Sequence, residues 1–238
     1  MNKLRDLLFV PHCAGCGERL AVGMGALCND CHTAYEMEKE RGCPYCGQRF
    51  SACLCAGDFL GKNGVKEVSK LFQYYPRDGE AVTNRMIYLL KHRAPRPLVA
   101  LLAHDLAETV APRLTKDRSH LIVTYAPRGR RARYRFGLDH MAILSRAVAE
   151  ELGGVWHPLL SRREGREQKK RPTRRERFLN MKEAYTYIGK EDLRAAQILL
   201  LDDVTTSGAT LMFAARTLRR AGARHLITAV IGQTLLKN

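Results

Sequence analysis

A single stretch, residues 198–211, constrains the fold of this chain more than any other part of it. It opens with four apolar residues, Ile-Leu-Leu-Leu, which are typical of a strand buried on both faces of a parallel sheet. Asp202 and Asp203 follow at the predicted carboxyl end of that strand, where open α/β sheets bind their ligands. A run of small residues comes next, and apolar residues then recur at helical spacing over 211–218. The stretch therefore predicts a strand, an acidic pair, a loop and a helix that form one ligand site.

The chemistry of this stretch suits a phosphorylated sugar. Backbone amides in the loop and at the start of the helix can hold a phosphate. The two carboxylates can accept hydrogen bonds from neighbouring hydroxyls, as on a ribose, or hold a divalent cation. A strand end with a helix cap is the simpler interpretation, but a cap needs one such residue and no acidic pair. The predicted ligand-binding loop consists of Thr205, Thr206, Ser207, Gly208, Ala209 and Thr210.

The net charge of +16 is concentrated in two segments. Residues 127–135 hold five arginines and no acid, and residues 161–177 hold nine Lys or Arg against three Glu. Such segments favour anions, either phosphates or nucleic acid, although runs of charge are often merely solvated. Arg128 follows an apolar run at 120–125, so it is a candidate for binding pyrophosphate. The candidate nucleic-acid-binding residues are Arg162, Arg163, Lys169, Lys170, Arg171, Arg174 and Arg175.

All eight cysteines lie within residues 13–55, mostly in Cys-x-x-Cys pairs. Four thiolates complete a tetrahedral structural zinc site, so eight predict two Zn(II) sites. We pair them in sequence order, as Cys13, Cys16, Cys28 and Cys31, and then Cys43, Cys46, Cys53 and Cys55. An interleaved pairing, in which the two Cys-x-x-Cys-Gly knuckles share one metal, is the alternative. Two such sites would change the formal charge from +16 to about +12.

The chain is expected to be cytoplasmic. Residues 7–10 form an apolar run too short for the core of a signal peptide, and no run has the length of a membrane span. In a reducing compartment, clustered cysteines favour metal ligation over disulfides or a redox pair.

Hydrophobic periodicity predicts an α/β fold with a parallel sheet flanked by helices, preceded by a small double zinc ribbon. We expect the ribbon over 1–57 and the α/β domain over 58–238, with 56–67 as a linker or irregular strand. The predicted strands are 68–75, 120–125, 155–159, 184–188, 197–201 and 225–232, and the predicted helices are 79–92, 98–110, 139–152 and 208–221. Residues 161–180 are expected to form a loop that leads into a short helix.

The loop at 202–210 closely resembles the phosphoribosyl-pyrophosphate signature of the type I phosphoribosyltransferases, with Ser207 in place of the usual second threonine. A cysteine-rich ribbon followed by such a domain resembles the ComF family of bacterial competence proteins. The further landmarks of that resemblance are Lys91, Tyr125-Ala126-Pro127, Gly137-Leu138-Asp139-His140, Gln168, Arg177, Asn180 and Ala184-Tyr185.

The resemblance implies a type I phosphoribosyltransferase-like fold and a part in DNA uptake during natural transformation. It implies binding of phosphoribosyl pyrophosphate with Mg(II), with Lys91 and Arg128 near the substrate and Asp202 and Asp203 at the catalytic position. Single-stranded DNA and other competence proteins are the implied partners. Two alternatives of other classes stay open: an active phosphoribosyltransferase for a nucleobase or amine with a purely structural ribbon, and a sensor that binds the sugar phosphate without turnover.

Overall fold

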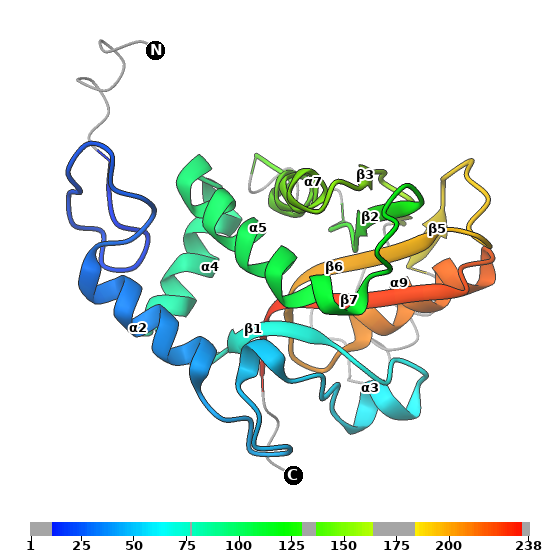
Figure 1. Ribbon diagram of the computed structural model, residues 1–238, viewed down its shortest axis with the longest axis horizontal. Helices are drawn as coiled ribbons and strands as arrows, with labels where there is room; N and C mark the ends of the chain where they lie inside the picture. The colour runs from blue at the N-terminus through cyan, green and yellow to red at the C-terminus, as the bar shows by residue number, and fades with distance from the viewer. Residues whose placement is uncertain (1–10, 77, 130–136, 164–183, 235–238) are drawn as a thin grey trace, which may run out of the picture.

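The computed structural model describes residues 11–76, 78–129, 137–163 and 184–234 (Figure 1). Its centre is a parallel sheet of five strands in the order β1-β7-β6-β2-β3. The strands are β1 (Ser69–Gln73), β2 (Leu121–Tyr125), β3 (Val155–Trp156), β6 (Gln197–Thr205) and β7 (His225–Gln233). A separate antiparallel pair joins β4 (Leu160–Arg162) to β5 (Tyr185–Tyr187).

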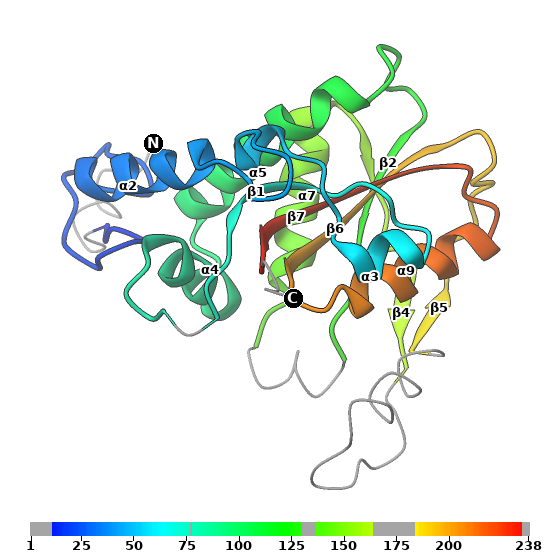
Figure 2. The ribbon, with the colours of Figure 1, turned by 90° about the horizontal axis from the view of Figure 1, so that it is seen from below.

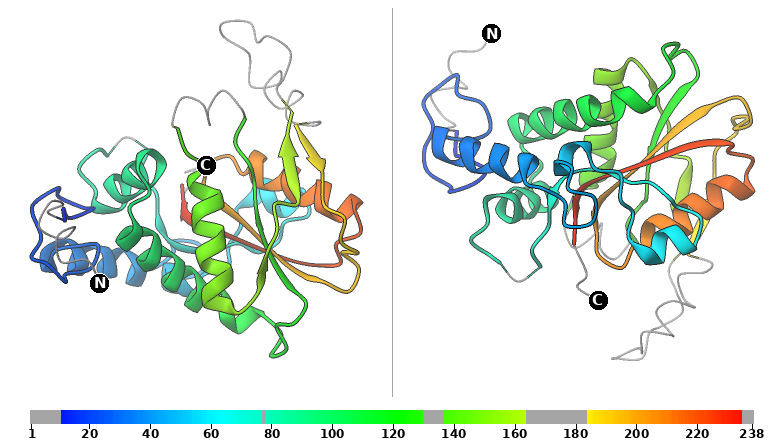
Figure 3. Two further views of the ribbon diagram at one scale, coloured as in Figure 1. Left: turned by 90° about the horizontal axis from the view of Figure 1, so that it is seen from above. Right: turned by 60° about the horizontal axis from the view of Figure 1, so that its bottom comes forward.

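Helices cover both faces of the sheet, as the views in Figures 2 and 3 show. On one face lie α5 (Arg96–Val110) and α7 (His140–Leu152), and the 3-10 turn η2 (Ala111–Arg113) follows α5. On the other face lie α9 (Ala209–Arg220), the short α3 (Asp58–Lys62) and the β4–β5 pair. Strand residues alternate between the two cores: Leu199 and Leu201 face the first, and Ile198 and Leu200 face the second.

The cysteine-rich segment packs against the sheet through α2 (Asn29–Glu40). Tyr35 of α2 is fully buried, and its hydroxyl donates to Asp105 of α5 over 2.6 Å. The same helix contacts β1, α4 (Val82–His92) and the 3-10 turn η1 (Phe50–Ala52). A single hydrophobic core therefore extends from the first cysteines to β7, across the boundary predicted at residues 57 and 58.

The structure confirms the predicted α/β class, with a parallel central sheet, flanking helices and a cysteine-rich N-terminal region. Several elements differ from the sequence-based expectation. The strand expected at 155–159 ends at Trp156, and β4 extends to Arg162, where a loop was expected from residue 161. Residues 56–67, expected to be a linker or irregular strand, contain α3, whose Leu60 is buried. The strand expected at 197–201 continues to Thr205, so the acidic pair lies inside β6 and not beyond its end. Backbone pairing of Asp202, Val204 and Thr205 with β7 extends the strand past the last apolar residue.

Candidate functional site

The acidic pair lies on β6 at the carboxyl edge of the sheet. Neighbouring residues of a strand point to opposite faces, so Asp202 and Asp203 diverge. Asp203 points toward α4 and α7, where it meets basic groups, whereas Asp202 lies on the side of Tyr185 in β5. Each carboxylate also accepts a backbone amide: Asp202 Oδ1 from Asp203 at 2.9 Å, and Asp203 Oδ1 from Val204 at 2.6 Å.

Three basic side chains from three elements converge on Asp203 Oδ2. Lys91, near the end of α4, lies at 3.0 Å, and Arg128, from the loop after β2, lies at 2.8 Å. His140, the first residue of α7, donates from Nε2 at 3.2 Å. Its other ring nitrogen, Nδ1, is buried and has no partner among the described residues. The two permanent cations outnumber the single anion that they share, so this side of the site retains affinity for a further negative charge.

The surroundings of the two carboxyl groups shift their pKa values in opposite directions. Burial, together with the charge of Asp203, raises the pKa of Asp202 to about 8. Burial alone would also raise the pKa of Asp203, but the hydrogen bond from His140 and the charges of Lys91 and Arg128 outweigh it and hold that pKa well below its usual value. Burial lowers the pKa of His140, so its imidazole is neutral at neutral pH. The pair therefore holds one ionised and one protonated carboxyl group when the site holds no ligand.

The predicted ligand-binding loop joins β6 to α9. Gly208 adopts a left-handed conformation, with φ of 76°, and its carbonyl accepts the amide of Met212 at the first turn of α9. A Cβ at Gly208 would lie 2.5 Å from Leu60 of α3, so the loop is pressed against that helix. Ser207 accepts the amide of Ala209 over 3.5 Å. The loop and the start of α9 consist mainly of small residues, and backbone amides at the start of a helix can hold a phosphate.

Gly208→Ala should destabilise the protein by about 2–4 kcal/mol, because it combines a left-handed backbone penalty with a steric conflict against buried Leu60. Urea unfolding followed by circular dichroism measures the change. Gly61→Ala is the matched control: it lies in α3 next to Leu60, a Cβ there meets nothing, and alanine favours a helix. Equal stability of the two variants would show that the close contact between Gly208 and Leu60 does not exist.

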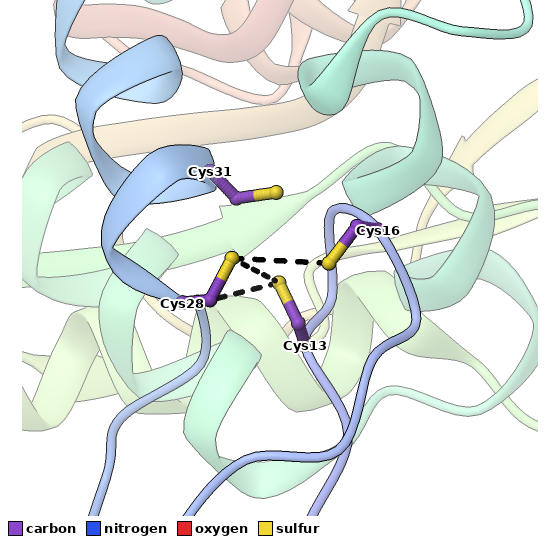
Figure 4. Close-up of side chains that lie close together, drawn as sticks. All are labelled: Cys13, Cys16, Cys28 and Cys31. Atoms are coloured by element: carbon purple, nitrogen blue, oxygen red, sulfur yellow. Dashed lines mark hydrogen bonds between the residues drawn. The ribbon is translucent and has the colours of Figure 1, made fainter.

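The eight cysteines form two separate groups of four, paired in sequence order rather than interleaved. In each group the four sulfur atoms all lie within 4.8 Å of one another, which suits a tetrahedral metal such as zinc. In the first group, the four sulfurs turn toward a common centre (Figure 4). Cys28 precedes α2 and Cys31 lies in its first turn, so this group also fixes the start of the helix. The thiols present fit two Zn(II) ions.

The second cysteine group is tied to the sheet by Lys70 of β1. This lysine is fully buried, and its ammonium donates to the carbonyl oxygens of Cys55 at 2.7 Å and Val68 at 3.1 Å. Burial lowers the pKa of Lys70, while the nearby cysteine thiols oppose that shift. A backbone bridge between Cys55 and Glu67 adds a second link. A buried cation beside four thiolates partly balances the negative charge of a Zn(Cys)4 centre.

The predicted nucleic-acid-binding residues are only partly within the described chain. Arg162 lies on β4 with its guanidinium 5.7 Å from the ring centre of Tyr185, and the backbone amide of Arg163 donates to Ala184. The other five candidates lie outside the described residues: Lys169, Lys170, Arg171, Arg174 and Arg175. The same is true of the landmarks Gln168, Arg177 and Asn180. Most of the arginine run at 127–135 lies outside them as well.

The structure adds site residues that the sequence did not mark as such. His140 was noted only as part of a landmark block, yet it contacts Asp203 directly. Lys70 lies in a predicted strand, and nothing in its neighbours signals a buried cation. Among the described helices, none has both the length and the apolar character that crossing a bilayer requires.

Comparison with known proteins gives distant similarities. No protein-family model matches the sequence, and no curated protein matches it. Among solved structures, the chain is similar to a purine phosphoribosyltransferase from Pyrococcus horikoshii Ot3, with a TM-score of 0.38, 17% identity, and coverage of 58% of this chain and 77% of that one. The chain is also similar to a hypoxanthine phosphoribosyltransferase from Staphylococcus aureus, with a TM-score of 0.37, 9% identity, and coverage of 59% of this chain and 74% of that one. For an adenine phosphoribosyltransferase from Leishmania tarentolae, the TM-score is 0.35 and the identity is 18%, with coverage of 60% of each chain. These similarities concern the fold alone.

Proposed function

We propose that this chain is a ComF-like protein that binds phosphoribosyl pyrophosphate with Mg(II) and single-stranded DNA, and that it acts in the cytoplasm in DNA uptake. The observation that carries the ligand assignment is the convergence of Lys91, Arg128 and His140 on Asp203, beside the loop at 205–210. A ligand with vicinal hydroxyls between two phosphorylated ends matches this order of carboxylates, cations and amides.

Each group has a defined part in binding. The loop amides and hydroxyls hold the 5′-phosphate at the start of α9. Asp203 accepts a ribose hydroxyl, while Lys91 and Arg128 turn from Asp203 toward the pyrophosphate. Asp202 gives up its proton when a cation approaches, because a nearby positive charge favours the ionised form. Asp202 and Asp203 would hold Mg(II), which would offset the charge that develops on the pyrophosphate leaving group.

The nucleic-acid part of the proposal rests on charge. The formal net charge is +16, and the segment 161–177 carries nine basic residues against three acidic ones. Binding to a polyanion through such a segment releases counterions, so its affinity must fall steeply with salt. The first basic residues of this segment are Arg162, which ends β4, and Arg163, which follows it.

Fluorescence anisotropy of labelled single-stranded DNA, in a salt series with zinc-loaded protein, tests this proposal. Replacement of Lys169, Lys170, Arg171, Arg174 and Arg175 by glutamine should make the slope of log K against log salt shallower by up to about 3.5. Lys116→Gln with Arg224→Gln is the control, since these exposed residues precede β2 and β7 at the opposite edge of the sheet. Adding phosphoribosyl pyrophosphate and Mg(II) should shift the affinity. An affinity for single-stranded DNA that does not change with salt concentration would refute the nucleic-acid assignment.

A second function is favoured by one observation, a pocket beside the loop. Thr205, Gln233 and Thr234 line it, and each carries a buried polar atom that has no partner among the described residues. It is an active phosphoribosyltransferase that transfers the sugar phosphate to a nucleobase or amine, with the zinc ribbon as a structural part. Release of pyrophosphate in the presence of a panel of bases would distinguish this function from binding without turnover.

A further inference from the structure

A groove of about 520 Å³ lies between α5 and α7, on the first face of the sheet. The two helices lie side by side, and the left view of Figure 3 looks onto α7 from this side. Each helix leads into a strand of the parallel sheet, α5 into β2 and α7 into β3, so both helices run in the same direction. The groove shares no lining residue with the candidate site, so it needs an explanation of its own.

The groove exposes apolar surface next to small side chains. Ile143 of α7 lines it and is 42% exposed. One turn further along α7 lies the half-buried Ala147, and Ala100 of α5 is exposed on the facing helix. Val99 and Ala103 are buried and complete the lining. A hollow lined by alanines lets another helix approach closely, and an exposed branched side chain beside it supplies a matching projection.

The two ends of the groove carry opposite charges. Arg96 is the first residue of α5, whereas Glu150 lies in the last turn of α7. Both side chains are exposed, and within the described part of the chain neither forms an ion pair. Glu151 adds a second carboxylate at the same end, 3.5 Å from His104 of α5. Since the helices run in the same direction, the positive end of the groove and its negative end lie about two helical turns apart.

We propose that two copies of this chain associate through this groove about a two-fold axis. A two-fold interface uses the same patch on both copies, so the patch must be complementary to itself. Rotation by 180° about an axis through the middle of the groove brings Arg96 of one copy opposite Glu150 of the other, twice in each dimer. The same rotation brings Ile143 of each copy against the alanines of the other. The charges of the patch thus balance locally, in a chain whose net charge of +16 otherwise opposes self-association.

Sedimentation equilibrium of the zinc-loaded full chain measures this association, in about 0.15 M salt to screen the long-range repulsion. The wild type should dimerise in the micromolar range. Arg96→Glu and Glu150→Arg should each weaken the dimer at least about tenfold, because each turns two attractive contacts into repulsive ones. Both variants should fold normally, since a negative charge suits the start of a helix and a positive charge suits its end.

A mixture of the two variants gives the sharpest test. In a dimer of Arg96→Glu with Glu150→Arg, each end contact again joins a positive to a negative side chain, so the mixture should recover the wild-type association. A chain that carries both substitutions should recover it as well. Ile143→Asn should weaken the dimer through the apolar part of the groove. Ile188→Asn is the matched control, because Ile188 is 52% exposed and follows β5 on the other face of the sheet.

The possible results separate cleanly. Loss of the dimer in each single variant, with recovery on mixing, supports the interface. A wild-type chain that stays monomeric at its highest soluble concentration overturns it, and so does a dimer that Ile143→Asn and the two charge reversals leave unchanged. Weakening without recovery on mixing overturns the two-fold arrangement. None of these measurements involves phosphoribosyl pyrophosphate or DNA, so their outcome is independent of the proposed function.

Discussion

Removal of zinc should cost more stability than any single substitution elsewhere in the chain. Structural zinc sites in small peptides contribute about 10–16 kcal/mol of apparent binding free energy, and that energy acts as folding energy. Both groups of thiols are joined to the main core here: Cys13 and Cys31 through the contacts of α2, and the second group through Lys70 and the bridge at Cys55. Chelation should therefore loosen the sheet as well as the ribbon.

Cys13→Ser and Cys53→Ser separate the two sites. Each should lower the zinc content from two ions to one and lower the melting temperature by more than 10 °C, as measured by elemental analysis and thermal unfolding. His32→Ala is the control, because His32 is exposed and four thiols already complete the nearby group. Full zinc content in either cysteine variant would contradict the assignment of that site.

The two neighbouring aspartates should respond in opposite directions to the same substitution. Asp203→Asn should destabilise the protein by about 2–4 kcal/mol at neutral pH, because it leaves Lys91 and Arg128 crowded without their shared anion. Asp202→Asn should stabilise it, because an amide is neutral and wild-type Asp202 must lose a proton in a buried place as pH rises. Both variants should lose affinity for phosphoribosyl pyrophosphate.

The two pKa shifts predict different pH dependences for the stability effects of Asp202→Asn and Asp203→Asn. A carboxyl group with a raised folded-state pKa takes up a proton on folding, so its contribution to stability declines between about pH 4 and pH 8. The advantage of Asp202→Asn should therefore grow across that window. Asp203 has a lowered pKa, so its contribution is complete above about pH 4 and disappears in acid. Chemical unfolding at pH 4, 6 and 8 should therefore show an advantage of Asp202→Asn that grows with pH and a cost of Asp203→Asn that stays nearly constant. Parallel pH profiles for the two variants would refute the assignment.

The sequence predicted the parts of this protein that depend on local pattern. Apolar runs and helical periodicity located the parallel strands and the helices α4, α5, α7 and α9. Cysteine spacing predicted two groups of four thiols, and the structure brings together the same two sets. The roles assigned to Asp202, Asp203 and the following loop stay predictions, although Lys91 and Arg128 do meet Asp203.

Features that depend on contacts between distant segments of the chain could not be predicted from the sequence. α3 is five residues long and contains two polar or charged residues and a glycine, so its periodicity is too short to detect. Lys70 is buried only because β1 lies between the second cysteine group and β7. Tyr45, Gln233 and residues 205–208 line the pocket beside the ligand-binding loop. No local sequence pattern in any of these segments indicates that the others lie nearby.

The pairing of β1 with β7 has a consequence for synthesis of the chain on the ribosome. β1 follows the second cysteine group and α3 in the chain, yet its partner in the sheet is β7, with Ser69 opposite Ala229. The cysteine groups can load metal as soon as they emerge, but the buried Lys70 and Phe72 lack their strand partner until β7 has been translated. Such distant pairing slows folding and lengthens the exposure of apolar surface. Early metal loading would then protect the nascent N-terminal half from aggregation while it waits for β7.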